Sequence, residues 1–154
     1  MIRFFILLFL VILLSGLQVF GFSIFGIRPN LALAIIITAS FFVENIWQGF
    51  LLVVLMTLIL KFSPGFESEI LALSLIGVGA VLIKKYLPWH YFFSNLILVG
   101  LGTLIFYVIL ASSLITSVIF FEELAFNIIA GMIIFAFLSL LWDNKLHEIF
   151  VRSY

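Results

Sequence analysis

The chain has 154 residues, of which 66% are hydrophobic and 9% are charged, whereas soluble globular proteins are about 45–50% apolar and about 25% charged. With a mean hydropathy of +1.46, the chain lacks the polar side chains that a water-facing surface needs, so we predict an integral membrane protein. The formal net charge of zero argues against nucleic-acid binding, and the absence of cysteine excludes disulfides and thiolate chemistry.

The first membrane span is expected at about Phe4–Phe25. A hydrocarbon core of about 30 Å requires roughly 20 apolar residues per helix, and this segment follows a single cation, Arg3. A break is predicted at Gly26–Asn30, because Pro29 lacks an N–H group and disfavours helix at the residue before it.

Residues 31–60 form an apolar stretch that is too long for one upright span. Glu44 lies near its middle, where a carboxylate would be costly in lipid. We therefore predict two short spans, at about Leu31–Val43 and Ile46–Leu60, joined by a tight turn. If the pair is re-entrant instead, Glu44 becomes a candidate functional residue.

Three further spans are expected, at about Phe66–Ile83, Phe93–Ser112 and Leu124–Trp142. Lys61–Gly65 separates the third span from the fourth, with Ser63 and Pro64 suited to a helix start. The chain is thus predicted to be a single all-α domain over residues 1–154, a polytopic integral membrane protein with about six transmembrane helices.

The distribution of cations predicts the orientation of these spans. With six spans, five of the seven cations fall on the side of both termini, and the positive-inside rule makes that side cytoplasmic. We therefore expect a multi-pass membrane protein with both termini in the cytoplasm. The cations on the first side are Arg3, Lys84, Lys85, Lys145 and Arg152; those on the other side are Arg28 and Lys61.

Two pairs of glycines mark candidate packing or partner-docking positions. Gly77 and Gly79 lie in the fourth predicted span, and Gly100 and Gly102 lie in the fifth. Small residues allow membrane helices to approach closely, so helix packing is the first interpretation and docking of a partner the second.

Glu122 and Glu123 precede an apolar segment, and such a pair resembles the Glu-Glu-x-x-x-Arg motif of CAAX-processing intramembrane proteases. Asn127 stands where the arginine belongs, and the only later histidine is His147. We therefore expect a solvated turn at the start of the sixth helix, with an intramembrane hydrolase as a further hypothesis.

Other catalytic or metal centres find little support in the sequence. An aspartyl peptidase needs two carboxylates in reach of each other, and the chain has one aspartate, Asp143. The two histidines, His90 and His147, are too far apart in the chain for a helical metal motif. We expect no enzymatic activity, no metal and no cofactor.

The length and span layout of the whole chain, and short motifs between Arg28 and Phe66, resemble the family of rod shape-determining protein MreD. Arg28-Pro29-Asn30-Leu31 is similar to the family's Arg-Pro-Asp/Asn-Leu stretch, which opens its second span. Gly49-Phe50 resembles the Gly-Phe lead into the third span, and Ser63–Phe66 stands at the turn before the fourth. Many members carry an aspartate in that turn, where this chain has Lys61.

The resemblance implies a non-catalytic membrane scaffold of the bacterial cell-elongation complex. Such a protein would dock MreC and, through it, MreB and the peptidoglycan elongation synthases. The resemblance also implies a location in the bacterial inner membrane and a fold similar to the substrate-binding subunits of energy-coupling-factor transporters. The alternative is a small-molecule-binding transporter subunit, which needs a polar pocket between helices. The polar residues available for that pocket are Glu44, Asn95, Thr103, Tyr107 and Asn127.

Overall fold

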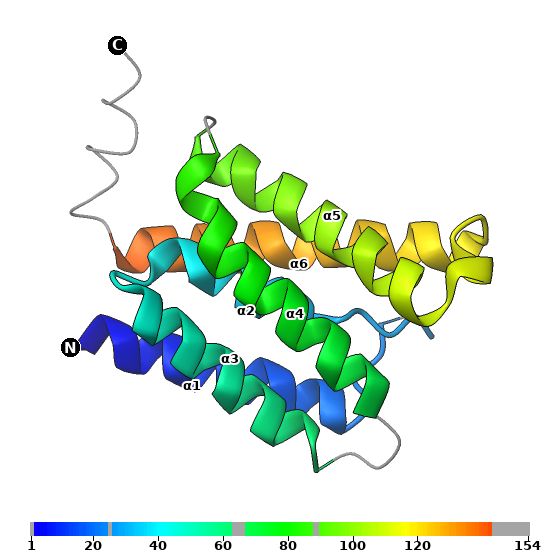
Figure 1. Ribbon diagram of the computed structural model, residues 1–154, viewed down its shortest axis with the longest axis horizontal. Coiled ribbons are helices and arrows are strands. Elements are labelled where there is room, and N and C mark those ends of the chain that lie inside the picture. The colour runs from blue at the N-terminus through cyan, green and yellow to red at the C-terminus, as the bar shows by residue number, and fades with distance from the viewer. Residues whose placement is uncertain (1, 25, 63–66, 88–89, 143–154) are drawn as a thin grey trace.

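The computed structural model describes residues 2–24, 26–62, 67–87 and 90–142, and these residues form a bundle of six α-helices (Figure 1). Short 3₁₀ turns follow α4 and α5, at Lys84–Tyr86 and Ser112–Leu114. The α-helices are α1 (Ile2–Val19), α2 (Leu31–Phe42), α3 (Ile46–Leu60), α4 (Glu67–Ile83), α5 (Tyr91–Leu110) and α6 (Val118–Leu141).

Successive helices run in opposite directions along the bundle, as Figure 1 shows. The guanidinium of Arg3, near the start of α1, lies over the ring of Trp142, which directly follows α6, at 5.8 Å from the ring centroid. Both ends of the described chain therefore meet at one end of the bundle.

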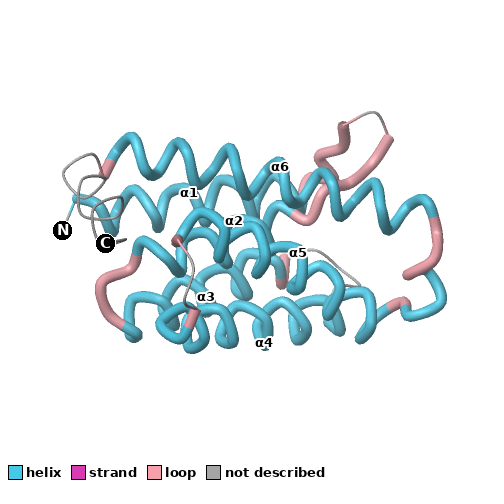
Figure 2. Tube along the Cα trace, turned by 90° about the horizontal axis from the view of Figure 1, so that it is seen from above, coloured by secondary structure: helices cyan, strands magenta, loops and turns pink. Residues whose placement is uncertain are grey.

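Helix α2 forms the centre of the bundle. Its residues 31–40 are all buried, and it packs against each of the other five helices. Figure 2 shows it between α6 on one side and α4 on the other. A helix that is apolar on every side is stable only when it is enclosed, and Leu31–Phe42 has no charged residue at all.

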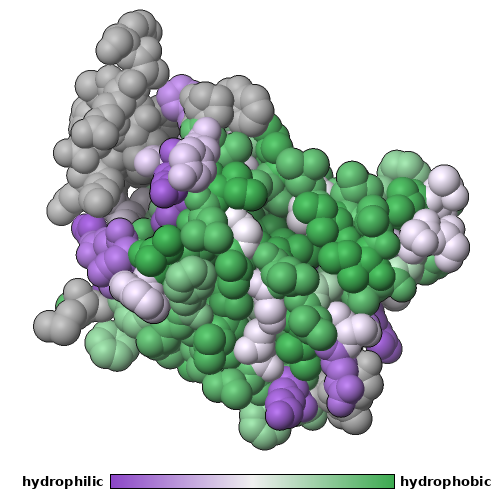
Figure 3. Space-filling view, in the orientation of Figure 1, coloured by the Kyte–Doolittle hydropathy of each residue, from purple (hydrophilic) through white to green (hydrophobic). Residues whose placement is uncertain are grey.

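The outer surface of the bundle is apolar. Large hydrophobic side chains point outward from every helix except α2, and examples are Phe5, Val54, Leu71, Val108 and Ile133, each more than half exposed. Figure 3 shows a broad face that is largely hydrophobic, with hydrophilic residues mainly along its edges. By length and composition, α1, α5 and α6 could each cross a membrane, which agrees with the predicted α-helical membrane protein.

The predicted end of the first span is wrong. Helix α1 ends at Val19 rather than at Phe25, a residue outside the described part of the chain. The chain leaves the helix through Gly21, at φ +73°, and turns again at Gly26, at φ +85°. Both values lie in the left-handed region that glycine adopts without strain.

The last two helices also differ from the prediction. Helix α5 covers Tyr91–Leu110, a shift of its bounds toward the N-terminus. Helix α6 begins at Val118 instead of Leu124, because the Ser117 side chain caps it by accepting a hydrogen bond from the Phe120 N–H (3.3 Å). The predicted turn at residues 63–66 and the polar tail at residues 143–154 lie outside the described residues.

Candidate functional site

The stretch Arg28-Pro29-Asn30 fixes the start of the central helix. Asn30 is the N-cap of α2, and its side-chain Oδ1 accepts a hydrogen bond from the Leu33 N–H (3.0 Å). Its backbone N–H donates to Oδ1 of Asn127 in α6 (2.7 Å). Asn30 and Pro29 are buried, whereas Arg28 is exposed.

Two further side chains complete this junction. Gln18, near the end of α1, accepts a hydrogen bond from the Ala32 N–H through its Oε1 (2.8 Å). Asn127 donates from Nδ2 to Oγ1 of Thr103 in α5 (3.1 Å). The N-terminus of α2 is thus tied by side-chain hydrogen bonds to α1 and α6, and through Asn127 to α5.

A second buried polar contact lies further along α2. Thr38 donates from Oγ1 to Oδ1 of Asn95 in α5 (3.0 Å), and Asn95 donates from Nδ2 to the Gly131 carbonyl of α6 (3.3 Å). Both side chains are fully enclosed. They satisfy each other inside the bundle, as buried polar groups must.

Glu44 lies at the opposite end of α2, in the turn that leads into α3. Its side chain is exposed, and its backbone N–H donates to Oε1 of Gln48 (3.0 Å). Close by, Lys84 donates from Nζ to the carbonyls of Ser40 and Val43. Glu44 is therefore a turn residue, and it is remote from the groups at the start of α2.

The four glycines differ in their surroundings. A Cβ atom on Gly102 would lie 2.6 Å from Cδ1 of Ile37, and one on Gly77 would lie 3.0 Å from Cγ2 of Val53. These two glycines face packed neighbours. A Cβ atom on Gly79 would meet no atom within 4 Å, and one on Gly100 would meet only Cδ1 of Ile128, at 3.9 Å.

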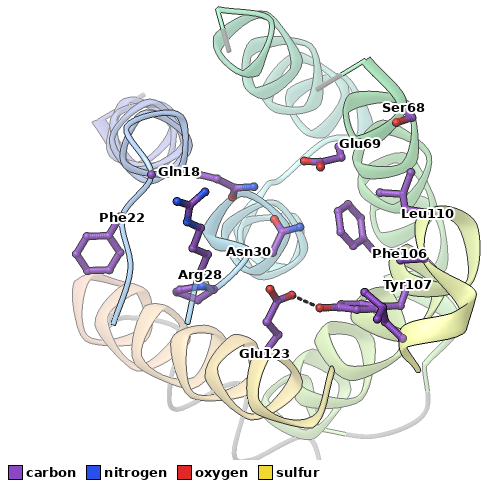
Figure 4. Close-up of a pocket in the computed structure, with 14 residues that line it drawn as sticks. Gln18, Phe22, Arg28, Asn30, Ser68, Glu69, Phe106, Tyr107, Leu110 and Glu123 are labelled. Atoms are coloured by element: carbon purple, nitrogen blue, oxygen red, sulfur yellow. Dashed lines mark hydrogen bonds between the residues drawn. The ribbon is translucent and has the colours of Figure 1, made fainter. Parts of the chain in front are cut away.

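A cavity of about 420 Å³ opens at the end of the bundle where α2 begins. Its walls come from the end of α1, the segment before α2, the starts of α4 and α6, and the end of α5. Figure 4 shows the side chains of Arg28, Glu69 and Glu123 around this space. The remaining residues that line it are Gln18, Gly21, Phe22, Pro29, Asn30, Ser68, Phe106, Tyr107, Leu110, Ala111 and Leu114.

One hydrogen bond joins two of the polar groups in the wall. The Tyr107 hydroxyl donates to Oε2 of Glu123 (2.7 Å), as the dashed line in Figure 4 marks. Glu122, the neighbour of Glu123, is exposed and does not line the cavity. The two glutamates thus face different surroundings, because consecutive residues on a helix point about 100° apart.

The cavity gathers only some of the residues that the sequence singles out. Arg28, Pro29, Asn30, Tyr107 and Glu123 line it. Asn95, Thr103 and Asn127 lie within the helix packing instead, bonded to other protein groups.

Sequence reasoning gave no role in a pocket to Glu69 or Gln18, both of which line the cavity. The only feature of the sequence that could have indicated them is the rarity of polar side chains in so apolar a chain.

Within the described residues, no group of three His, Asp or Glu side chains could hold a metal ion. Comparisons with known protein families, with curated proteins and with solved structures found no match for the chain.

Proposed function

We propose that the chain is a non-catalytic membrane scaffold of the MreD type in the bacterial inner membrane. In this role it docks MreC laterally and, through MreC, holds MreB and the peptidoglycan elongation synthases in one complex. Its six helices cross the membrane in alternation, and both termini face the cytoplasm.

The observation that carries the proposal is the position of Arg28-Pro29-Asn30-Leu31. This stretch resembles the family motif, and it stands at the head of the one helix that every other helix contacts. Asn30 supplies both the cap of α2 and the link to Asn127. A motif with this structural task fits a protein whose function resides in its helical framework.

The bundle geometry supports an even number of crossings. Successive helices alternate in direction (Figure 1), and Arg3 and Trp142 meet at one end. Helix α2 is about 18 Å long at 1.5 Å per residue, less than the hydrocarbon thickness. Because protein surrounds it on all sides, its short length leaves no backbone facing lipid.

Co-purification and depletion test the scaffold. MreC should be recovered with the tagged protein from detergent-solubilised membranes of rod-shaped cells that carry both, and depletion should round those cells. Recovery of MreC should survive Glu44→Gln, a change in an exposed turn. Normal rods after clean depletion, together with the absence of MreC from the purified protein, would contradict the proposal.

A second candidate function is a small-molecule-binding membrane subunit of a transporter. The cavity favours it, because it combines a few polar groups with an aromatic and aliphatic wall, as ligand pockets do. Native mass spectrometry of the purified protein should then reveal a bound small molecule, and an ATPase should co-purify. Purification without ligand, ATPase or transport partner would argue against this function.

A further inference from the structure

We propose that the cavity at the start of α2 binds a zwitterion, a ligand with a protonated primary amine close to an anionic group. This inference deepens the second candidate function, since it names the chemistry of the ligand. It is independent of docking to MreC.

The charges in the wall define that chemistry. Glu69 from α4 and Glu123 from α6 supply two carboxylates, and Arg28 from the segment before α2 supplies one guanidinium. Figure 4 shows the three side chains converging on one space from three elements. A protonated amine complements the two carboxylates, and an anionic group complements the fork of the guanidinium.

The charged groups of the wall have hydrogen-bonding atoms that no other protein group occupies within the described residues. Within the described residues, neither the Arg28 guanidinium nor the Glu69 carboxylate makes a hydrogen bond or a salt bridge. Glu123 engages Tyr107 through Oε2, which leaves Oε1 for a ligand. Glu69 and Glu123 are half-buried, and charged groups in a partly apolar wall are costly unless they are paired, so a ligand with a protonated amine would be stabilised there.

The remaining wall limits the size of the ligand. Phe22, Phe106, Leu110 and Leu114 contribute apolar surface, and the volume of about 420 Å³ lies within the range of about 300–1,000 Å³ typical of small-molecule pockets. An amino acid, a dipeptide or the headgroup of phosphatidylethanolamine carries the required pair of charges. All three present the same pair of charges, so binding experiments must decide whether the ligand is a soluble molecule or a lipid.

The unmodified protein provides the first test. In detergent, alanyl-alanine should bind in isothermal titration, whereas N-acetyl-alanyl-alanine, which lacks the amine, and alanyl-alanine amide, which lacks the carboxylate, should bind at least tenfold more weakly. In nanodiscs, phosphatidylethanolamine should raise the melting temperature above that in phosphatidylcholine, whose headgroup lacks N–H donors. A response in the first assay alone indicates a soluble ligand, and a response in the second alone indicates a lipid.

Matched variants then locate the site. Glu69→Gln should weaken the responding probe by about tenfold or more, the loss expected for one charge-assisted hydrogen bond. Glu67→Gln should leave it unchanged, because Glu67 is exposed in the same turn of α4 and does not line the cavity. In a second pair, Glu123→Gln should weaken binding by a similar factor, and Glu122→Gln, at an exposed position outside the cavity, should leave it unchanged.

Three outcomes would overturn the inference. The first is an equal loss of binding affinity in a cavity variant and its matched control. The second is that neither the soluble probe nor the lipid probe binds. The third is a native mass spectrum with a bound molecule that lacks an amine. In that last case the second candidate function would stand while the assignment of a zwitterion would fall.

Discussion

At the scale of single residues, Asn127 links three helices through its side chain. It accepts from the Asn30 N–H and donates to Thr103, so it joins α2, α5 and α6 at one point. It is 1% exposed, so water cannot replace either hydrogen bond. The sequence suggested Asn127 as a pocket residue because it is one of few polar side chains. Its structural role could not be predicted, since its partner Asn30 is 97 positions away in the chain.

Asn127→Ala should lower the free energy of unfolding by about 1–3 kcal/mol, because it leaves a buried N–H group without an acceptor. Thermal unfolding in detergent micelles would measure the loss. Asn45→Ala is the matched control, since Asn45 is exposed and its side chain makes no capping hydrogen bond. Equal melting temperatures for the two variants would contradict a structural role for Asn127.

The glycines of α5 offer a prediction with an internal control. Gly102→Val should destabilise the bundle by about 1–3 kcal/mol, the usual cost of overpacking, because a Cβ atom there would press on Ile37 and Ile76. Gly100→Val should cost clearly less, because its nearest neighbour is 3.9 Å away. The melting temperatures of the two variants would measure the difference in stability. A larger drop in melting temperature for Gly100→Val than for Gly102→Val would be inconsistent with this packing.

At the scale of elements, Lys84 stabilises the end of α2 from a distant part of the chain. Its ammonium donates to two carbonyls, those of Ser40 and Val43, at the C-terminal end of the helix. A cation there also interacts favourably with the helix dipole. Burial lowers the pKa of Lys84 from its usual value, and the two carbonyls offset part of that desolvation.

Lys84→Met should therefore cost about 1–2 kcal/mol of stability, while keeping most of the apolar side-chain volume. Lys85→Met is the control, because Lys85 is exposed and lies over the ring of Tyr86, at 4.7 Å. Hydrogen exchange of the amides at residues 39–43 would show where the effect lies. Unchanged exchange in Lys84→Met would refute the role of this lysine as a cap.

Much of the element order could be predicted from charges and turn residues. Pro29-Asn30 marks the start of α2, and Glu44 marks the turn between two short helices. The end of α1 could not be predicted, because residues 20–25 remain apolar after the helix stops. Composition cannot separate a helix from an apolar loop. The early start of α6 was obscured by the glutamates that follow Ser117.

The site was harder to predict than the fold. Its polar groups come from five segments, and only the packing of the helices brings Arg28, Glu69 and Glu123 together. The sequence marks each of them as a rare charge in an apolar chain, but it does not give their separation in space. Glu69 lies in the first turn of α4, where a carboxylate also favours the helix dipole, so its position alone does not point to a pocket.

At the scale of the whole molecule, the alternating direction of the helices predicts that successive connections between them lie on opposite sides of the membrane. The chain has no cysteine, so single cysteines can report their side of the membrane without background. With the cytoplasmic termini proposed above, Glu44→Cys and Lys85→Cys should react only with membrane-permeant maleimide in intact cells. Ser23→Cys and Lys61→Cys, also at exposed positions, should react with the impermeant reagent. Labelling of Glu44→Cys and Lys85→Cys from opposite sides would rule out six crossings.

The enclosure of α2 has a consequence for the biogenesis of the protein. Twelve residues make a poor independent substrate for lateral release into lipid, since insertion favours segments of about 20 apolar residues. Its polar anchors on α5 and α6 emerge from the ribosome long afterwards. Until the later helices are synthesised and pack against it, we expect the α2 segment to be paired with α3 or bound by the insertion machinery. A chain truncated after Leu60 should consequently be a substrate for membrane quality-control proteases.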